Sequence, residues 1–202
     1  HGGAMSAGET RAPVHFGLRL REQVEQKRAI ARCAAGLIQP GETIFLDAGS
    51  TCYFLADALP EGLGVTVVTH SLDNMNVLRS RKGVTLIGLG GQLDPTLCAF
   101  TGPMTEGALQ MMSATRGFLG AAGIDPARGC TNNSIVETRV KSLMNERATN
   151  SYVLADGSKF SQPSLWLTIA IDQVRHVITD ATAPPEGVAL LRGRGIDVLI
   201  AS

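Results

Sequence analysis

Short apolar segments alternate with amphipathic segments along most of this 202-residue chain, and this order constrains the fold more than any single motif. Runs rich in Val, Ile, Leu and Thr have the length of buried strands, while the segments between them carry apolar residues at helical spacing. The expected strands are 44–46, 65–69, 84–87, 117–123 (running into a Gly-rich loop), 152–155, 167–171, 177–179 and 198–200. The expected helices are 16–38, 52–59, 72–79, 104–112, 134–147 and 184–191. We therefore expect an α/β fold, in which a largely parallel open sheet carries helices on both faces.

The length and composition fit one domain. Hydrophobic residues make up 44% of the chain, which is enough for a sizeable core, and no repeat or internal linker divides it. Residues 1–14 are small, polar and Pro-containing, so we expect them to be a linker and residues 15–202 to form the domain. The Gly-rich start lacks the charged and apolar regions of a signal peptide.

The charge and cysteine content exclude several classes of protein. Lys+Arg and Asp+Glu both count 18, so the chain lacks the basic footprint of a nucleic-acid binder. No apolar run is long enough to span a bilayer. The four cysteines contain no C-x-x-C pair and no His/Cys cluster with zinc spacing. We expect reduced thiols, a cytoplasmic location, no metal and no cofactor.

The segment Asp47-Ala48-Gly49-Ser50-Thr51 is the strongest candidate for a binding site. It joins an expected strand to an expected helix, at the strand end where open α/β sheets bind ligands. Gly49 allows the backbone to come close to a ligand. The hydroxyls of Ser50 and Thr51, with the free N–H groups of the helix start, can hold phosphate oxygens. Taken alone, the segment is equally well explained as a helix cap by Ser50 or Thr51.

Four further loops follow strands and are expected at the same edge of the sheet. They are Thr69-His70-Ser71, Gly90-Gly91, Gly120–Gly123 and Asp156-Gly157-Ser158-Lys159. Ordinary turn chemistry explains each one separately. Together the five loops predict a polar site for a small, hydroxylated, anionic molecule.

Two charged features sharpen this prediction. Lys159 places a cation at the edge, and Glu137 and Lys141 lie one helical turn apart. Taken alone, Lys159 is better explained as a solvated loop charge, and the pair as a surface i,i+4 interaction.

These loops, in this order, resemble the C-terminal effector domain of DeoR-family bacterial transcriptional regulators over essentially the whole chain. Residues 47–51 resemble the family's D-x-G-[ST]-T loop, and residues 67–71 its V-V-T-N-S segment, with His70 in place of the usual Asn. Gly90-Gly91 resembles its Gly pair, and residues 118–124 its F-x-G-x-x-G-[IV] stretch. The E-x-x-x-K helix, the A-D-x-S-K-F segment and the late T-D correspond to residues 137–141, 155–160 and 179–180.

The resemblance implies a sensor domain of a DNA-binding regulator of sugar or carbohydrate metabolism, and a repressor is the expected kind. The start His1-Gly2-Gly3-Ala4 is similar to the H-G-G-A that follows the winged helix-turn-helix in this family. DNA would then be contacted only through that absent head, no membrane is involved, and a homo-oligomer, dimer or tetramer, is expected. The implied effector is a phosphorylated sugar or a related metabolic phosphate.

The expected ligand-binding residues lie in these loops and in the E-x-x-x-K helix. Gly49, Ser50 and Thr51 are assigned to the phosphate, with Lys159 as its charge partner. The others are Asp47, Thr69, His70, Ser71, Gly90, Gly91, Gly120, Glu137, Lys141 and Asp156.

The resemblance also implies a fold like that of ribose-5-phosphate isomerases and CoA-transferases, which offers an enzymatic alternative. In the isomerases an acidic D-G-A-D-E segment supports catalysis and an E-K helix start carries the base, a position similar to that of Glu137. The acidic segment corresponds here to Gly120-Ala121-Ala122-Gly123, which carries no carboxylate. We therefore expect no catalytic residue and a fold retained for binding. The alternatives are an enzyme, either an aldose–ketose phosphate isomerase or a related sugar-phosphate hydrolase, and a purely structural oligomerisation domain.

Overall fold

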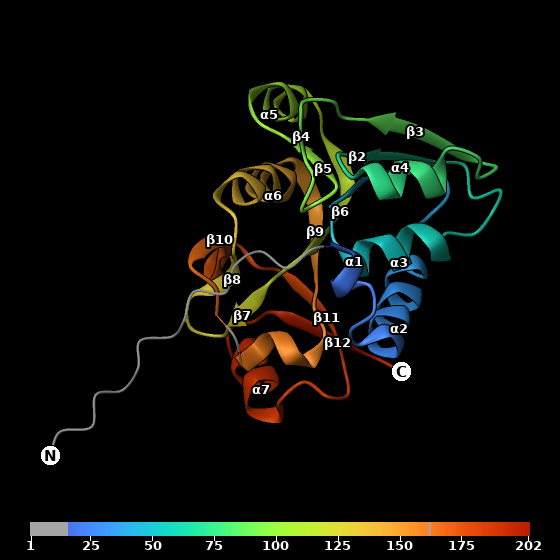
Figure 1. Ribbon diagram of the computed structural model, residues 1–202. Helices are drawn as coiled ribbons and strands as arrows, with labels where there is room; N and C mark the ends of the chain where they lie inside the picture. The colour runs from blue at the N-terminus through green and yellow to red at the C-terminus, as the bar shows by residue number, and fades with distance from the viewer. Residues whose placement is uncertain (1–15, 162) are drawn as a thin grey trace, which may run out of the picture.

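A computed structural model describes residues 16–161 and 163–202, and it confirms the expected parallel sheet (Figure 1). Seven strands, all paired in parallel, lie in the order β12-β11-β9-β6-β1-β2-β3. Their bounds are β1 Thr43–Leu46, β2 Val65–Thr69, β3 Val84–Gly88, β6 Ala114–Gly120, β9 Ala148–Leu154, β11 His176–Asp180 and β12 Asp197–Ala201. The linker expected at 1–14 lies outside the described residues.

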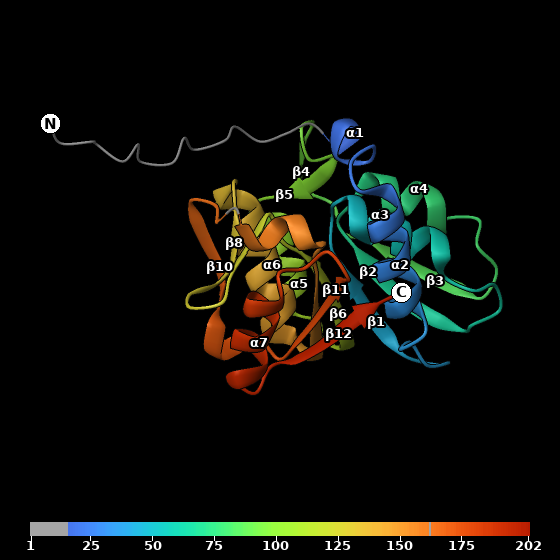
Figure 2. The ribbon, with the colours of Figure 1, turned by 90° about the horizontal axis from the view of Figure 1, so that it is seen from below.

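Helices cover both faces of this sheet, as expected (Figures 1 and 2). One face carries α2 (Val24–Ala35), α3 (Ser50–Ala58) and α4 (Leu72–Leu78), and the other carries α5 (Pro103–Gln110), α6 (Ile135–Arg147) and α7 (Pro185–Gly193). The central strand β1 shows why. Ile44 and Leu46 belong to the core cluster under α2 and α3, whereas Phe45 belongs to the cluster under α5, α6 and α7. Because successive side chains of a strand point to opposite faces, a fully apolar strand requires cover on both sides.

The register of the central strands brings their carboxyl ends together. Leu46, the last residue of β1, pairs with Thr69 of β2 on one side and with Phe118 of β6 on the other. The residues that follow these strands therefore lie side by side at one edge. This is the edge at which the sequence predicts the ligand site.

Two small antiparallel sheets were not expected from the sequence. One pairs β4 (Gln92–Asp94) with β5 (Ala99–Thr101), and the other has the order β10-β8-β7. The strand expected at 167–171 is present as β10 (Trp166–Ala170), but it pairs with β8 (Gly129–Asn132), which pairs in turn with β7 (Gly123–Asp125). Strands of three or four residues with polar and Gly positions are too short to give a periodic signal.

The helix expected at 16–38 is divided in two, which corrects the sequence prediction. α1 (Phe16–Arg19) ends in a turn, and Gln23 has a left-handed backbone conformation, with φ 50° and ψ 43°, before α2 begins. The Nζ of Lys27 donates hydrogen bonds to the carbonyl oxygens of Arg19 and Glu22, so a buried cation satisfies carbonyls that a continuous helix would have used. Along the described ranges, no helix has the length and apolar character needed to cross a membrane.

Candidate functional site

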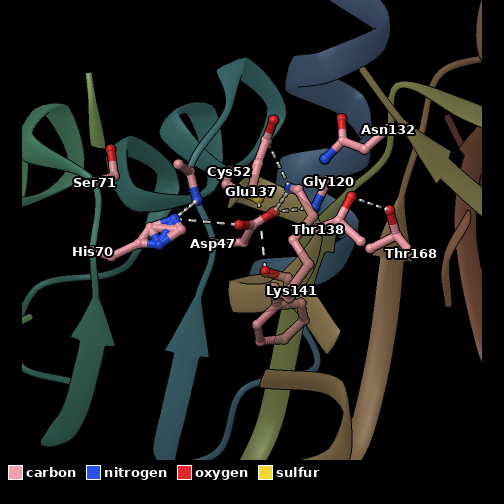
Figure 3. Close-up of polar contacts among 12 residues, drawn as sticks. Asp47, Cys52, His70, Ser71, Gly120, Asn132, Glu137, Thr138, Lys141 and Thr168 are labelled. Atoms are coloured by element: carbon pink, nitrogen blue, oxygen red, sulfur yellow. Dashed lines mark hydrogen bonds and ion pairs between the residues drawn. The ribbon is translucent and has the colours of Figure 1, made fainter. Parts of the chain in front are cut away.

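A buried ionic cluster lies where β1 ends, and we call it the Asp47 cluster; it comprises Asp47, His70, Glu137 and Lys141 (Figure 3). Lys141 and Glu137 lie one turn apart on α6, and both point toward the end of β1. The Nζ of Lys141 contacts Oδ2 of Asp47 directly and lies 3.1 Å from Oε1 of Glu137. The Gly120 amide, at the end of β6, donates to the same Asp47 oxygen at 2.8 Å. The structure thus brings together four of the predicted residues, although the first and the last of them, Asp47 and Lys141, are 94 positions apart in the sequence.

Burial and mutual attraction determine how this cluster titrates. Burial raises the pKa of Asp47, although Lys141 opposes the shift. Burial acts in the same sense on Glu137, but there the positive charge of Lys141 prevails and lowers the pKa. Burial would lower the pKa of Lys141, yet the two carboxylates raise it well above its ordinary value. Lys141 therefore stays protonated at neutral pH and holds the carboxylates of two different elements.

His70 follows β2 and is fully buried beside Asp47. Its Nε2 accepts a hydrogen bond from the Ala48 amide at 3.3 Å and lies 3.5 Å from Oδ1 of Asp47. Burial, reinforced by the nearby charge of Lys141, lowers the pKa of His70 to about 4. The ring is therefore neutral at pH 7, and its contact with Asp47 is not an ion pair.

Asn74 connects the remaining residues of this loop. Its Nδ2 donates to the backbone carbonyl of Asp47 at 2.9 Å and to Oγ1 of Thr69 at 3.3 Å. The hydroxyl of Ser71 caps α4 by accepting the Asn74 amide at 3.2 Å. Thr69 and Ser71 therefore have structural roles in fixing the β2–α4 turn against Asp47.

The Gly-Ser-Thr segment forms the start of α3, as predicted. Gly49 is the N-cap residue, with φ 123°, and no side chain of the residues that the structure describes caps this helix end. Ser50 and Thr51 are buried in its first turn. A Cβ placed on Gly49 would meet no atom within 4 Å, so open space rather than protein adjoins this backbone. A helix start without a side-chain cap leaves N–H groups for another acceptor.

Asp156 and Lys159 follow β9 at the same edge. Asp156 is buried, and its Oδ1 accepts from the amide and hydroxyl of Ser158, while Lys159 lies in the short helix η1 (Gly157–Ser161). Both influence Lys27 of α2, whose pKa falls to about 8 chiefly because it is buried; Asp156 opposes that fall and Lys159 adds to it. This second group of charges therefore includes a cation that the loop motifs did not predict.

Gly90 and Gly91 lie apart from these contacts. The carbonyl of Gly90 accepts from the Thr105 hydroxyl of α5 at 2.8 Å. Gly91 has φ 150°, and a Cβ there would lie 2.3 Å from Oγ1 of Thr105. Within the described residues, no hydrogen bond or ion pair joins either glycine to the Asp47 cluster. Close packing on α5 thus accounts for this Gly pair, and its contact with a ligand stays a prediction.

Four residues at this edge were missed by sequence reasoning: Asn74, Asn132, Lys27 and Arg19. Asn132 lies beside the Asp47 cluster, where its side chain helps to lower the pKa of Glu137 (Figure 3). Lys27 gave a usable signal, because it occupies the same helical face as the buried apolar residues of α2. The two asparagines and Arg19 belong to none of the loop or helix motifs of the sequence.

The donor set does not suit a metal ion. In the ranges 16–161 and 163–202, no group of three or more His, Cys, Asp or Glu side chains could hold one. The buried carboxylates are instead compensated by Lys141, which is the arrangement of a fixed polar framework rather than of metal ligands.

Comparison with known proteins decides the family. Residues 22–181 match the DeoR C terminal sensor domain. The chain belongs to the DeoR family. Three curated relatives of this DeoR-type chain are named as transcriptional regulators. The repressor AccR of Agrobacterium fabrum is 33% identical over 183 residues, which cover 90% of this chain and 70% of that protein.

The other two relatives are similarly distant. The regulator IolR of Bacillus subtilis is 30% identical over 179 residues, covering 89% of this chain and 71% of that protein. The L-fucose operon activator of Escherichia coli is 31% identical over 165 residues, covering 82% and 68%. Of these three relatives, the activator is named for the operon of a sugar, L-fucose.

Solved structures confirm the expected isomerase-like fold. Ribose 5-phosphate isomerase A from Methanocaldococcus jannaschii aligns with a TM-score of 0.51 at 18% identity, over 69% of this chain and 55% of that chain. The eIF2B beta subunit from Chaetomium thermophilum gives 0.52 at 17% identity, over 70% and 44%. At these identities the likeness concerns the fold alone, since one fold hosts many functions.

Proposed function

We propose that this chain is the effector-binding domain of a DeoR-type repressor of sugar metabolism, and that it binds a phosphorylated sugar or a related metabolic phosphate without transforming it. The observation that carries the proposal is the start of α3. Within the described ranges it has no side-chain cap, its first turn contains Ser50 and Thr51, and it begins three residues after the buried Asp47. Free N–H groups and hydroxyls at a helix start suit a phosphate.

The residues around α3 supply groups for the rest of such a ligand. We assign the phosphate to Gly49, Ser50 and Thr51, with Lys159 as its charge partner. Oδ1 of Asp47 and Oδ2 of Asp156 are buried and accept no hydrogen bond from the described residues, so they are available to sugar hydroxyls. Polar groups that cannot all be satisfied within the protein are expected at a binding site.

Binding without catalysis follows from the state of Glu137. A base that abstracts a proton from a sugar needs a pKa near neutral pH. Lys141 lowers the pKa of Glu137 and occupies one of its oxygens at 3.1 Å. No carboxylate stands in the segment 120–123, where the isomerase motif is acidic. Glu137 therefore acts as a structural partner of Lys141.

Regulation would proceed by a population shift. The effector favours one arrangement of the sheet edge and of the segment that leads to the N-terminal DNA-binding head, and thereby changes the spacing of two heads. A palindromic operator is met by a symmetric assembly, so we propose a dimer or a tetramer.

A thermal-shift screen tests this function. Sugar phosphates and polyol phosphates should raise the melting temperature, while their dephosphorylated forms should not. The double variant Thr51→Val/Lys159→Ala should abolish the rise and keep the fold. Thr85→Val/Lys82→Ala makes the same chemical changes at exposed positions on the edge strand β3 and before it, and should keep the rise. Absence of any shift across the panel in the unmodified chain would refute effector binding.

The enzymatic alternative has its own test. Incubation with ribose 5-phosphate and similar sugar phosphates should give no isomerised product. Turnover that disappears in Glu137→Ala, while circular dichroism shows an intact fold, would establish catalysis instead of sensing.

A further inference from the structure

The segment 16–23, which we call the connector, lies against the start of α3. The ring of Phe16 meets the ring of Tyr53 edge-on, with centroids 6.0 Å apart, and the Phe16 amide donates to the carbonyl of Thr96 at 3.2 Å. The Tyr53 amide in turn donates to the carbonyl of Gly49 at 2.9 Å. The connector is therefore fixed between the β4–β5 turn and the helix end to which we assign the phosphate.

The guanidinium of Arg19, in the connector, has two N–H groups without an acceptor in the described part of the chain. Arg19 follows Phe16 by three positions, so both side chains lie on the same face of α1. Its Nε and Nη2 are shielded from solvent, and neither finds an acceptor among the residues that the structure describes. Buried N–H donors without acceptors are costly, and a guanidinium offers them in the planar pairs that match phosphate or carboxylate oxygens.

The charges around Arg19 favour an anion at this place. The pKa of Lys27 falls to about 8, chiefly because the ammonium group is buried. Lys159 and Arg19 contribute to this fall, while the carboxylates of Asp156 and Glu22 oppose it. After Lys141, Arg19 is also the next positive charge that lowers the pKa of Glu137. Arg19, Lys27 and Lys159 therefore act on one region of the sheet edge, and an anion placed there would relieve their mutual repulsion.

We propose that Arg19 is an effector-binding residue, whose guanidinium takes the anionic group of the ligand held at the start of α3. The inference rests on the proposed function and adds a residue outside the loops that motif analysis identified. The ligand then bridges the connector and the sheet edge. Because Lys27 holds the carbonyls of Arg19 and Glu22, fixing Arg19 also fixes the turn into α2. Occupancy of the site would in this way reach the segment that leads toward the DNA-binding head.

Titration of inorganic phosphate and ribose 5-phosphate into three proteins tests this role. Arg19→Gln should weaken the binding of both by roughly tenfold to a hundredfold, the loss expected for a charge-assisted hydrogen bond. Arg21→Gln removes the same charge from an exposed position two residues away and should bind like the unmodified chain. Without ligand, the two variants should melt at the same temperature, since Lys27 contacts the backbone of Arg19 and not its side chain.

Hydrogen exchange of the connector amides gives a second readout. Ribose 5-phosphate should slow exchange across residues 16–23 in the unmodified chain and in Arg21→Gln, but not in Arg19→Gln. Unchanged affinity of Arg19→Gln, or equal losses in both variants, would overturn the role of Arg19 while leaving the proposed function intact. If the unmodified chain binds neither phosphate compound, the phosphate-binding role of Arg19 is refuted, while the proposed function is decided by the wider thermal-shift panel.

Discussion

Replacing Lys141 with Met should destabilise this domain by about 3–5 kcal/mol at pH 7, the cost of leaving buried charge without its partner. Asp47 and Lys141 are 0% and 2% exposed, and Nζ of Lys141 contacts Asp47 and lies 3.1 Å from Glu137. Met fills a similar volume, so the loss reports the two carboxylates rather than a cavity. Such a change is a large part of a typical unfolding free energy of roughly 5–15 kcal/mol.

Urea unfolding followed by circular dichroism measures this loss, and two control variants make it specific. Arg139→Met removes a cation from the same helix, but that side chain is 49% exposed and lies 3.7 Å from Glu106, so the expected loss is below about 1 kcal/mol. The triple variant Asp47→Asn/Glu137→Gln/Lys141→Met removes all three charges and should recover much of the stability lost in the single variant.

The pH dependence of Lys141→Met has a definite sign. Without the lysine, burial raises the pKa of both carboxyls above the unfolded values of about 4. The folded state then binds more protons than the unfolded state, so stability falls as pH rises from about 4 toward the folded pKa. The deficit relative to the unmodified chain should therefore be larger at pH 7 than at pH 4.5. A deficit below about 1 kcal/mol, or one that grows as the solution is acidified, would refute this account of the cluster.

Three further predictions concern single buried groups. The pKa of His70 falls from 6.5 to about 4, so between these pH values the unfolded state alone takes up a proton. The unmodified chain should therefore lose about 3 kcal/mol of unfolding free energy between pH 6.5 and 4, whereas His70→Asn should not. Equal losses for the two proteins in urea titrations would contradict this. Gly157→Ala places a Cβ 2.4 Å from backbone atoms and should cost about 1–3 kcal/mol, whereas Gly193→Ala meets nothing within 4 Å and should stay within about 0.5 kcal/mol by the same measurement. A thiol reagent should modify only the half-buried Cys33 and Cys98 in the native state, and all four thiols in urea; rapid reaction of a third native thiol would show that a core cysteine opens.

The parallel sheet could be predicted because its strands are apolar on both faces. The strand 65–69 was predicted residue for residue, since no other element fits a five-residue β-branched run bounded by Gly64 and His70. The small sheets could not, because the pairing of β8 with β10 joins segments more than 30 residues apart with no shared pattern. The break after Arg19 was equally hidden, since it depends on where Lys27 places its ammonium group.

The candidate site shows the same division. Asp47, His70, Gly120 and Lys141 were named from loop and helix motifs, and the structure joins them by direct contacts. The loop motifs mark residues that follow strands, so they could not find Arg19, which ends a single turn of helix packed on α3. The place of its guanidinium depends on tertiary packing, which leaves no local sequence pattern.

The Asp47 cluster joins the two layers of helices that cover opposite faces of the sheet. Lys141 arises from a helix on one face of the sheet, whereas Asn74, which holds the Asp47 carbonyl, arises from a helix on the opposite face. Asp47 is thus held at the edge of the sheet by contacts from both layers of helices. A molecule that drew the Asp47 carboxylate away from Lys141 would break one of the contacts that join the two layers. A local change at this carboxylate would then alter how the helices on the two faces are held together.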